Sequence, residues 1–262
     1  MFSPQNTRNR RIIWFDSFLE TPERGDVSSS RAELRAQRQA AASRSSNRRL
    51  IVVLAICVVV ALIVLVVGIL ITKSASYTVA ETRILGSIAE SRVPAIVSIS
   101  LGFNWFFSPP IAVITSVVIA GIIFAVTRRW LTVLHFAVLV LGTWLSSEVI
   151  KVIVHRPRPS GHVADVLVPN PDPDSYPSGH VCYAVGVTFA ILILVIRTQA
   201  KWVVLVLAIL VSLATAVSRI YLGIHYPTDV VASLVFAAAA FVAIEALWRR
   251  FVTPAPAEVA AN

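Results

Sequence analysis

The sequence predicts an all-α polytopic membrane protein, a bundle of six membrane-spanning helices with an interfacial segment between spans one and two. Of its 262 residues, 56% are hydrophobic and only 14% are charged, whereas a soluble domain has roughly 45–50% apolar and about 25% charged residues. The apolar residues also form long runs instead of amphipathic stripes. These observations exclude a soluble globular domain, a disordered chain and a disulfide-stapled secreted protein.

The chain begins with a polar region, residues 1–49, which holds ten Arg, five acidic residues and no sustained apolar period. Residues 28–49 are expected to form helix only transiently, because this region cannot bury a core. We therefore predict a disordered basic tail, and a second disordered tail over residues 251–262. Next to a bilayer, the partner expected for the basic tail is the anionic lipid surface and not nucleic acid.

Six apolar runs between residues 50 and 250 are each predicted to cross the membrane. They are Leu50–Thr72, Pro110–Thr127, Trp130–Ile150, Val181–Ile196, Trp202–Val217 and Val230–Leu247. The first begins too far into the chain for a signal peptide and is expected to stay as an anchor. Several runs have only about 16 to 18 residues, which is short for an apolar core roughly 30 Å thick, so polar motif residues are expected to complete their ends.

The stretch from Val93 to Phe107 is about 15 residues long and ends in four aromatic residues before a pair of prolines. Aromatic side chains concentrate at membrane–water interfaces. We interpret this stretch as an interfacial segment and not as a seventh crossing.

Basic residues predict the orientation of the six spans. With six crossings, four pairs of cations lie on one face, namely Arg48 and Arg49, Arg128 and Arg129, Arg197 and Lys201, and Arg249 and Arg250. The positive-inside rule makes that face cytoplasmic. Both termini are then cytoplasmic, and the loops 73–109, 151–180 and 218–229 lie on the outer face.

A second group of cations stands on this outer face, where the topology rule does not explain it. Lys151 and Arg158 are seven positions apart at the end of the third span, and Pro157 and Pro159 end the helix and turn the chain across the membrane surface. A single such cation would fit interfacial snorkelling. Two of them at one span end indicate a binding role.

The sequence Pro177-Ser178-Gly179-His180 directly precedes the fourth span. Proline is favoured in the first turn of a helix, so free backbone N–H groups of this segment are expected to point at an anion, with the helix dipole reinforcing them. Gly179 allows a ligand oxygen to approach the backbone. Taken alone, the same turn also fits a purely structural helix cap.

A third segment, residues 218–229, joins spans five and six. Pro227 is expected to open the sixth helix, which leaves His225 just outside it and Asp229 in its first turn. A carboxylate in that position can accept the ring N–H of an imidazole, the arrangement that makes a histidine a nucleophile or a base.

Together, three cations (Lys151, Arg158 and Arg219), a helix N-terminus and two histidines are predicted to converge at one end of the bundle. The ligand that matches them is a phosphate, whose oxygens suit arginine forks and backbone N–H groups. No metal or other cofactor is predicted, since no Asp and His cluster offers a cage, and Cys57 and Cys182 lack ligand neighbours and are expected to be small buried hydrophobic residues.

These residues resemble the three-part signature of the type 2 phosphatidic acid phosphatase family, which is related to vanadium haloperoxidases and bacterial class A acid phosphatases. The matching elements are Lys-x6-Arg-Pro from Lys151, Pro-Ser-Gly-His from Pro177, and Ser-Arg-x5-His-x3-Asp from Ser218. The resemblance covers residues 151–229, and each of the three motifs is complete.

The resemblance implies a phosphatase mechanism. His225 would attack phosphorus and form a phospho-histidine, Asp229 would orient it, and His180 would protonate the leaving lipid oxygen. The groups that would hold the phosphate oxygens are those of Lys151, Arg158, Arg219, Ser178 and Gly179. The expected protein is a metal-independent phosphatase of the plasma membrane, by its composition bacterial, acting at the extracytoplasmic face on phosphatidate, phosphatidylglycerophosphate or a polyprenyl diphosphate.

Two other functions stay open on the sequence alone. A phosphotransferase would pass the phosphoryl group to an alcohol instead of water. A headgroup-binding lipid transporter or scramblase would need ionisable residues along the span interiors, and almost none are present. The sequence predicts neither an oligomeric state nor the lipid headgroup and tail.

The remaining polar residues near the motifs receive weaker assignments. We interpret Glu148 as the helical partner of Lys151, and Glu245 as a residue that reaches water or Arg249. The other polar residues of the 151–180 loop are expected to be solvated, namely His155, Arg156, His162, Asp165, Asp172 and Asp174. Of these, His155, Arg156 and His162 could also recognise a second phosphate or a headgroup.

Overall fold

The computed structural model describes residues 24–160, 165–169 and 172–253, and within them the predicted all-α class is confirmed. The helices are α1 (Arg24–Lys73), α2 (Ala75–Glu90), α3 (Pro94–Phe106), α4 (Pro109–Thr127), α5 (Trp130–Val154), α7 (Gly179–Val195), α8 (Lys201–Tyr221) and α9 (Pro227–Phe251). The chain divides into two compact units, Met1–Arg49 with Pro256–Asn262, and Leu50–Ala255. The second unit contains all of the predicted site residues.

Helix α1 begins at Arg24, well before the first predicted span. Its residues 24–49 are therefore helical where the sequence predicts at most transient helix. Ala and Arg make up twelve of these 26 residues, and both have high helix propensity. The rest of the two predicted tails, residues 1–23 and 254–262, lies outside the described residues.

Five of the described helices are long and apolar enough to cross a membrane. They are Ser43–Lys73 of α1 and the whole of α4, α5, α8 and α9. The predicted fourth span is α7, which is apolar but has only 17 residues. The protein is therefore a helical membrane protein, and the sixth crossing stays a prediction in which residues outside α7 complete its length.

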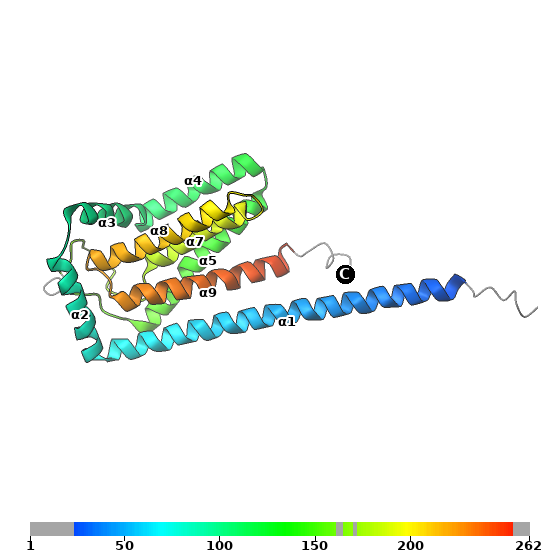
Figure 1. Ribbon diagram of the computed structural model, residues 1–262, viewed down its shortest axis with the longest axis horizontal. Coiled ribbons are helices and arrows are strands. Elements are labelled where there is room, and N and C mark those ends of the chain that lie inside the picture. Colours follow the sequence, from blue (N-terminus) through cyan, green and yellow to red (C-terminus); the bar gives the residue numbers. More distant parts are fainter. Residues whose placement is uncertain (1–23, 161–164, 170–171, 254–262) are drawn as a thin grey trace, which may run out of the picture. The chain divides into compact units, whose positions relative to one another are not determined.

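Helix α7 lies inside the bundle. It packs against α5, α8 and α9, beside which it runs in Figure 1, and nine of its residues are buried. Its sequence is apolar on every side, which is typical of a helix enclosed by other helices. This enclosure places the N-terminus of α7 among the ends of its neighbours, where the predicted motifs lie.

Two short helices, α2 and α3, fill the predicted outer loop between the first two spans. Figure 1 shows α2 running across one end of the bundle. Ser74 caps α2 by accepting a hydrogen bond from the amide of Tyr77, at 3.4 Å. Helix α3 covers the segment predicted to be interfacial, and its 13 residues span about 20 Å, too short to cross the membrane.

The last part of α1 packs against the loop that leads into α7. The Tyr176 hydroxyl donates a hydrogen bond to the carbonyl of Val64, at 2.6 Å, and the Tyr176 ring is fully buried. A Cβ atom at Gly68 would lie 2.5 Å from ring atom Cε1 of Tyr176. A glycine is therefore required for this ring to lie against α1.

Replacing Gly68 by alanine is expected to destabilise the protein by about 1–3 kcal/mol, because the enclosed Tyr176 ring cannot move away from the added methyl group. Gly121→Ala is the matched control, since nothing lies within 4 Å of the corresponding Cβ in α4, and alanine is the better helix former there. Thermal unfolding in detergent should show a lower midpoint for Gly68→Ala only. Equal midpoints for the two variants would contradict the packing argument.

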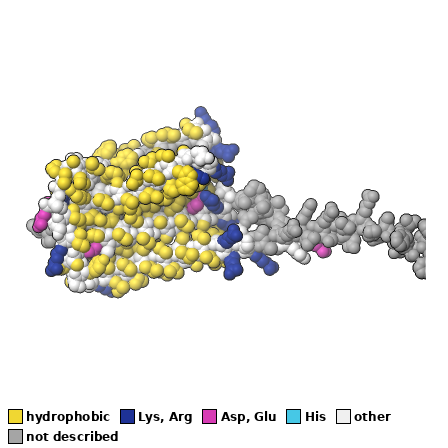
Figure 2. All heavy atoms as spheres, in the orientation of Figure 1, with side chains coloured by type: hydrophobic (Ala, Val, Ile, Leu, Met, Phe, Trp, Pro, Cys, Tyr) yellow, Lys and Arg dark blue, Asp and Glu magenta, His cyan; other side chains and the backbone are white. Residues whose placement is uncertain are grey.

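Lysine and arginine side chains gather at one end of the hydrophobic surface in Figure 2. The α4–α5 connection, the α7–α8 connection and the end of α9, which carry predicted cytoplasmic cations, lie at the end of the bundle opposite α2 in Figure 1. Near the end of α9, Glu245 pairs with Arg249, as the sequence indicates. It also contacts His135, at 2.6 Å between Oε2 and Nε2.

Candidate active site

The predicted site residues come together at the end of the bundle where α5 ends and α7 begins. Lys151 lies in the last turn of α5, Arg219 in the last turn of α8, and Asp229 in the first turn of α9. His225 lies just outside α9 and Pro227 opens that helix, both as the sequence predicts. A Cβ atom at Gly179, next to His180, would lie 3.8 Å from Lys151 Nζ, and Asp172 links Lys151 to Arg158, which contacts His225. The two histidines therefore lie at the same end of the bundle.

Local backbone pairing fixes the segment that carries Arg158. Helix α5 ends at His155, which has a left-handed backbone with φ of 48°. Pro157 then forms an antiparallel bridge with Asp174, and the amide of Ser175 donates to the Arg156 carbonyl at 2.7 Å. The segment after α5 is thus tied to the segment before α7, and the Arg158 amide and Nε donate to the carbonyls of Pro173 and Asp172 in that segment.

The His225 ring is buried, and its two nitrogens have different neighbours. Nε2 lies 2.9 Å from an Arg158 guanidinium nitrogen. A guanidinium only donates hydrogen bonds, so Nε2 is the unprotonated nitrogen and its electron pair accepts the Arg158 hydrogen bond. The ring proton therefore resides on Nδ1, which faces Asp229 Oδ2 at 3.6 Å, longer than a hydrogen bond.

Burial, followed by the positive charges of Arg158 and Arg219, holds the pKa of His225 well below its ordinary value of 6.5. The ring is consequently neutral at neutral pH. A neutral imidazole with its electron pair beside a guanidinium is suited to attack an electrophile that the guanidinium binds.

Lys151 and Arg158 are bridged by Asp172, which the sequence places in solvent. The Asp172 Oδ2 atom lies 2.7 Å from Lys151 Nζ and 3.3 Å from an Arg158 guanidinium nitrogen. Partial burial opposes ionisation of this carboxyl, but the hydrogen bond and charge of Lys151 hold its pKa below the ordinary value. The expectation that Asp172 is solvated is therefore wrong, because the two cations attract its carboxylate into the site.

Arg219 is fully buried, and among the described residues no carboxylate lies within ion-pair distance of it. One guanidinium nitrogen donates to Asn104 Oδ1 of α3, at 2.8 Å, and Nε lies 3.4 Å from Ser218 Oγ. Within the described part of the chain, the other terminal nitrogen has no hydrogen-bond partner, and neither has the buried hydroxyl of Ser178. A buried cation is costly without a counter-ion, so this arrangement fits an anionic ligand.

The start of α7 differs in part from the prediction. Pro177 lies before the N-cap residue Ser178 and not in the first turn. The Ser178 amide donates to Ser233 Oγ at 2.6 Å and is therefore not free for an anion. A Cβ atom at Gly179 would lie 2.9 Å from Glu148 Oε1, so a side chain of α5 lies close to this glycine, and the approach of a ligand oxygen stays a prediction.

Arg156 belongs to the interior, and its predicted solvated position is wrong. Its side chain is 1% exposed and pairs with Asp229 and with Glu81 of α2. Glu81 is not among the site residues that the motifs predict. The one sequence feature that indicates a role for it is its position as an acidic residue in a weakly charged helix of the outer loop.

The other polar residues of this region occupy the periphery. Glu148 pairs with Lys151 as predicted. The His155 side chain is 66% exposed and contacts Asp174, while the exposed Asp165 pairs with Arg92. His162 lies outside the described residues. Both cysteines are buried free thiols, as predicted.

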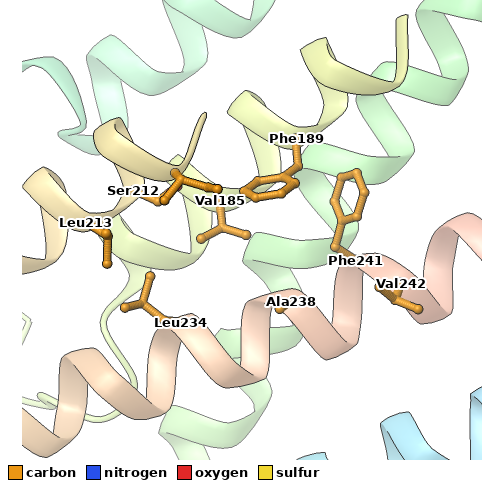
Figure 3. Close-up of a pocket in the computed structure, with 9 residues that line it drawn as sticks. Val185, Phe189, Ser212, Leu213, Leu234, Ala238, Phe241 and Val242 are labelled. Atoms are coloured by element: carbon orange, nitrogen blue, oxygen red, sulfur yellow. The ribbon is translucent and has the colours of Figure 1, made fainter. Parts of the chain in front are cut away.

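A separate apolar pocket of about 270 Å³ lies between α7, α8 and α9. Figure 3 draws the side chains that line it, among them Val185, Leu213 and Leu234. Along these three helices, the buried cluster of Val181, Ala216 and Val230 comes between the pocket and the candidate site. The pocket therefore contributes no group to the polar site.

Fold and site together define a class: a helical membrane protein with a buried cluster of cations beside a neutral histidine. The family model described as the PAP2 superfamily matches residues 131–252, which include all three motifs. This match agrees with the resemblance of the motifs to the type 2 phosphatidic acid phosphatase family. Glu81 and Asn104 both precede the matched residues.

Two curated proteins and one solved structure are similar to the chain. Undecaprenyl-diphosphatase BcrC of Bacillus subtilis is 29% identical over 116 residues, 44% of this chain and 57% of that protein. An undecaprenyl-diphosphatase of Sulfolobus acidocaldarius is 37% identical over 87 residues, 32% of this chain and 40% of that protein. The chain thus spans about half the length of the curated relatives it matches.

The similar structure is a transmembrane PAP2-type phosphatidylglycerolphosphate phosphatase from Bacillus subtilis. Its TM-score is 0.65 at 20% identity, and the alignment covers 74% of this chain and 96% of that one. At this identity, the likeness supports the fold alone.

Proposed function

We propose that the protein is a membrane-embedded phosphatase that hydrolyses a lipid phosphate or diphosphate through a phospho-histidine. The observation that carries the proposal is Arg219, a buried guanidinium without a carboxylate partner, in the same site as His225, Arg158 and Lys151. A phosphate would supply the missing counter-ion to Arg219 and place phosphorus beside a neutral imidazole.

In the first step, the Arg158 guanidinium binds a phosphate oxygen instead of His225, and the released electron pair of His225 Nε2 forms a bond to phosphorus as the bond to the lipid oxygen breaks. His180 gives its proton to that oxygen, and Asp229 stabilises the positive His225 ring through Nδ1–H. In the second step, water attacks phosphorus, loses a proton to His180 and releases His225. The cations neutralise the charge on the equatorial oxygens throughout.

We propose that the site faces the extracytoplasmic side of a bacterial plasma membrane and that both termini are cytoplasmic. This orientation is supported by the basic end of the bundle, because positively charged connections favour the cytoplasm. The named relatives support a polyprenyl diphosphate or phosphatidylglycerophosphate substrate.

A substrate panel tests this function. Purified protein in EDTA is assayed for phosphate release from phosphatidate, phosphatidylglycerophosphate and a polyprenyl diphosphate. We expect release from at least one lipid without added metal. A requirement for a divalent cation would contradict metal independence, and transfer of labelled phosphoryl groups to added alcohols in preference to water would identify a phosphotransferase.

The pH dependence of kcat/KM is expected to be bell-shaped, because His225 must be neutral while His180 is protonated. Protonation of His225 removes its electron pair, so its lowered pKa should move the acid limb below pH 6.5, the ordinary value for histidine. Burial, followed by the charge of Arg219, lowers the pKa of His180 as well, so the negative charge of a bound phosphate has to keep this ring protonated. The alkaline limb should report loss of the His180 proton and should disappear in His180→Asn. Rates that stay flat from acid to alkaline pH would contradict these roles.

Asp172→Asn is expected to strengthen phosphate binding by roughly tenfold, which corresponds to about 1.4 kcal/mol. In the ligand-free site, the Asp172 carboxylate forms ion pairs with Lys151 and Arg158. It therefore competes with phosphate oxygens for the same hydrogen-bond donors. The inhibition constant of inorganic phosphate measures the effect, with Asp165→Asn in the same loop as the control. Weaker inhibition in Asp172→Asn would show that the carboxylate supports the cations instead of competing.

A further inference from the structure

Glu81, Arg156 and Asp229 form a buried charge network behind the candidate nucleophile. The three side chains are 4%, 1% and 0% exposed. One terminal nitrogen of Arg156 donates to Asp229 Oδ1 at 2.6 Å, and the other donates to Glu81 Oε2. The guanidinium also lies 4.2 Å from the centre of the Tyr226 ring. Arg156 is therefore held on three sides in one orientation.

Glu81 reaches this network from α2 and also binds the start of α9. Its Oε1 atom accepts hydrogen bonds from both the amide and the hydroxyl of Thr228, each at 2.8 Å. The Thr228 amide belongs to the first turn of α9, where backbone N–H groups have no partner within the helix. The Thr228 hydroxyl accepts from Arg156 at 2.8 Å, so it links the two charged side chains.

Asp229 is oriented by these contacts. Its Oδ1 atom accepts from Arg156, and its Oδ2 atom accepts from the Tyr226 amide at 2.9 Å while facing His225 Nδ1. With both oxygens assigned, the plane of the carboxylate is fixed. Without Arg156, two buried carboxylates would lie close together with no cation between them, and the charge that faces His225 would change.

We propose that Glu81 and Arg156 are positioning residues of the reaction: Glu81 holds Arg156, Arg156 holds Asp229, and Asp229 orients His225. This inference rests on the proposed role of His225 as nucleophile. Glu81 precedes the residues that match the family model, so α2, which lies across the end of the bundle in Figure 1, contributes to the site from outside the matched region.

Because Glu81 and Arg156 carry opposite charges, removing one or the other should shift the acid limb of the pH profile in opposite directions. Glu81→Gln keeps an acceptor for Thr228 but removes a negative charge, so the His225 imidazolium becomes less favourable and the acid limb should move to lower pH. Arg156→Gln removes a positive charge, so the acid limb should move to higher pH. The double variant should restore the limb to within about 0.3 pH unit of the wild type, because its net change in charge is zero.

The experiment measures phosphate release from farnesyl diphosphate by the purified full-length protein between pH 4 and 9. We expect kcat to fall about tenfold in Glu81→Gln and about a hundredfold in Arg156→Gln, with KM changed less than about twofold, because the residues orient the nucleophile and do not bind substrate. Arg156→Lys and Glu81→Asp, which keep the charges, should recover part of the rate and leave the limb in place.

Glu90→Gln and Arg83→Gln are the matched controls, since both residues are exposed on the same helix as Glu81. Loss of activity with an unmoved acid limb in both Gln variants, or shifts of the same sign, would overturn the proposal and leave only a structural role. If Arg156→Gln does not fold, the pH profiles of Glu81→Gln and Arg156→Lys are sufficient to test the proposal. A His225→Ala protein that remains active would instead refute the proposed function, independently of this network.

Discussion

His225→Ala is expected to lower phosphate release by at least about 10⁴-fold, as removal of a covalent nucleophile does in other enzymes. The structure supplies the physical reason. Nε2 carries no proton, the ring is neutral, and the Arg158 guanidinium, a phosphate-binding group, lies 2.9 Å from the attacking atom. An alanine provides no group that could form the phosphorylated intermediate.

Two measurements check this expectation. Steady-state release from the lipid panel gives the loss of rate, and brief incubation with labelled substrate shows whether a phospho-enzyme accumulates in the wild type and is absent from the variant. His155→Ala is the control, because that histidine belongs to the same end of the bundle but has a side chain 66% exposed and turned to Asp174. Similar rates for the wild type and His225→Ala would refute the nucleophile.

Arg219→Leu is expected to abolish activity, by about 10³-fold or more, and at the same time to make the ligand-free protein more stable. The guanidinium is fully buried, and its described contacts are with the neutral groups of Asn104 and Ser218. Replacing an uncompensated buried charge by an apolar side chain commonly stabilises a protein, here by about 1–4 kcal/mol. The transferred phosphoryl group, however, loses one of its three cations.

Thermal unfolding with and without inorganic phosphate tests both halves of this prediction. Phosphate should raise the unfolding midpoint of the wild type, because it binds only the folded site, and should have little effect on Arg219→Leu. Arg219→Lys keeps the charge and should fall between the two. A variant that is less stable than the wild type without phosphate would show that Arg219 is already compensated in the empty site.

Local patterns were sufficient to predict the chemistry of the site. Pro227 marks the start of α9, so the positions of His225 outside the helix and Asp229 in its first turn followed from the sequence, and the structure confirms both. The same holds for the pairing of Glu148 with Lys151, which needs only the spacing of residues in a helix. Their roles in catalysis stay predictions until the variants are measured.

Contacts between distant segments were not predictable in this way. Glu81 and Thr228 are 147 residues apart, and Asn104 and Arg219 are 115 apart, so no periodicity or motif connects them. Arg156 and Asp172 were assigned to solvent because a loop rich in prolines and charges usually is solvated. Their burial or pairing depends on cations and carboxylates that other helices bring to the same place.

The amino-acid sequence alone determined the membrane class, the order of the apolar helices, the basic end of the bundle and the residues of the three motifs. These depend on the length of apolar runs, on proline positions and on residue type, all of which are properties of continuous stretches of the chain. Only the tertiary structure decided which charges neutralise one another, that Arg219 keeps a donor without a partner among the described residues, and that Glu81 of α2 contacts the arginine that pairs with Asp229. Electrostatic pairing in a buried site is set by distance in space, and that distance exists only once the helices have packed.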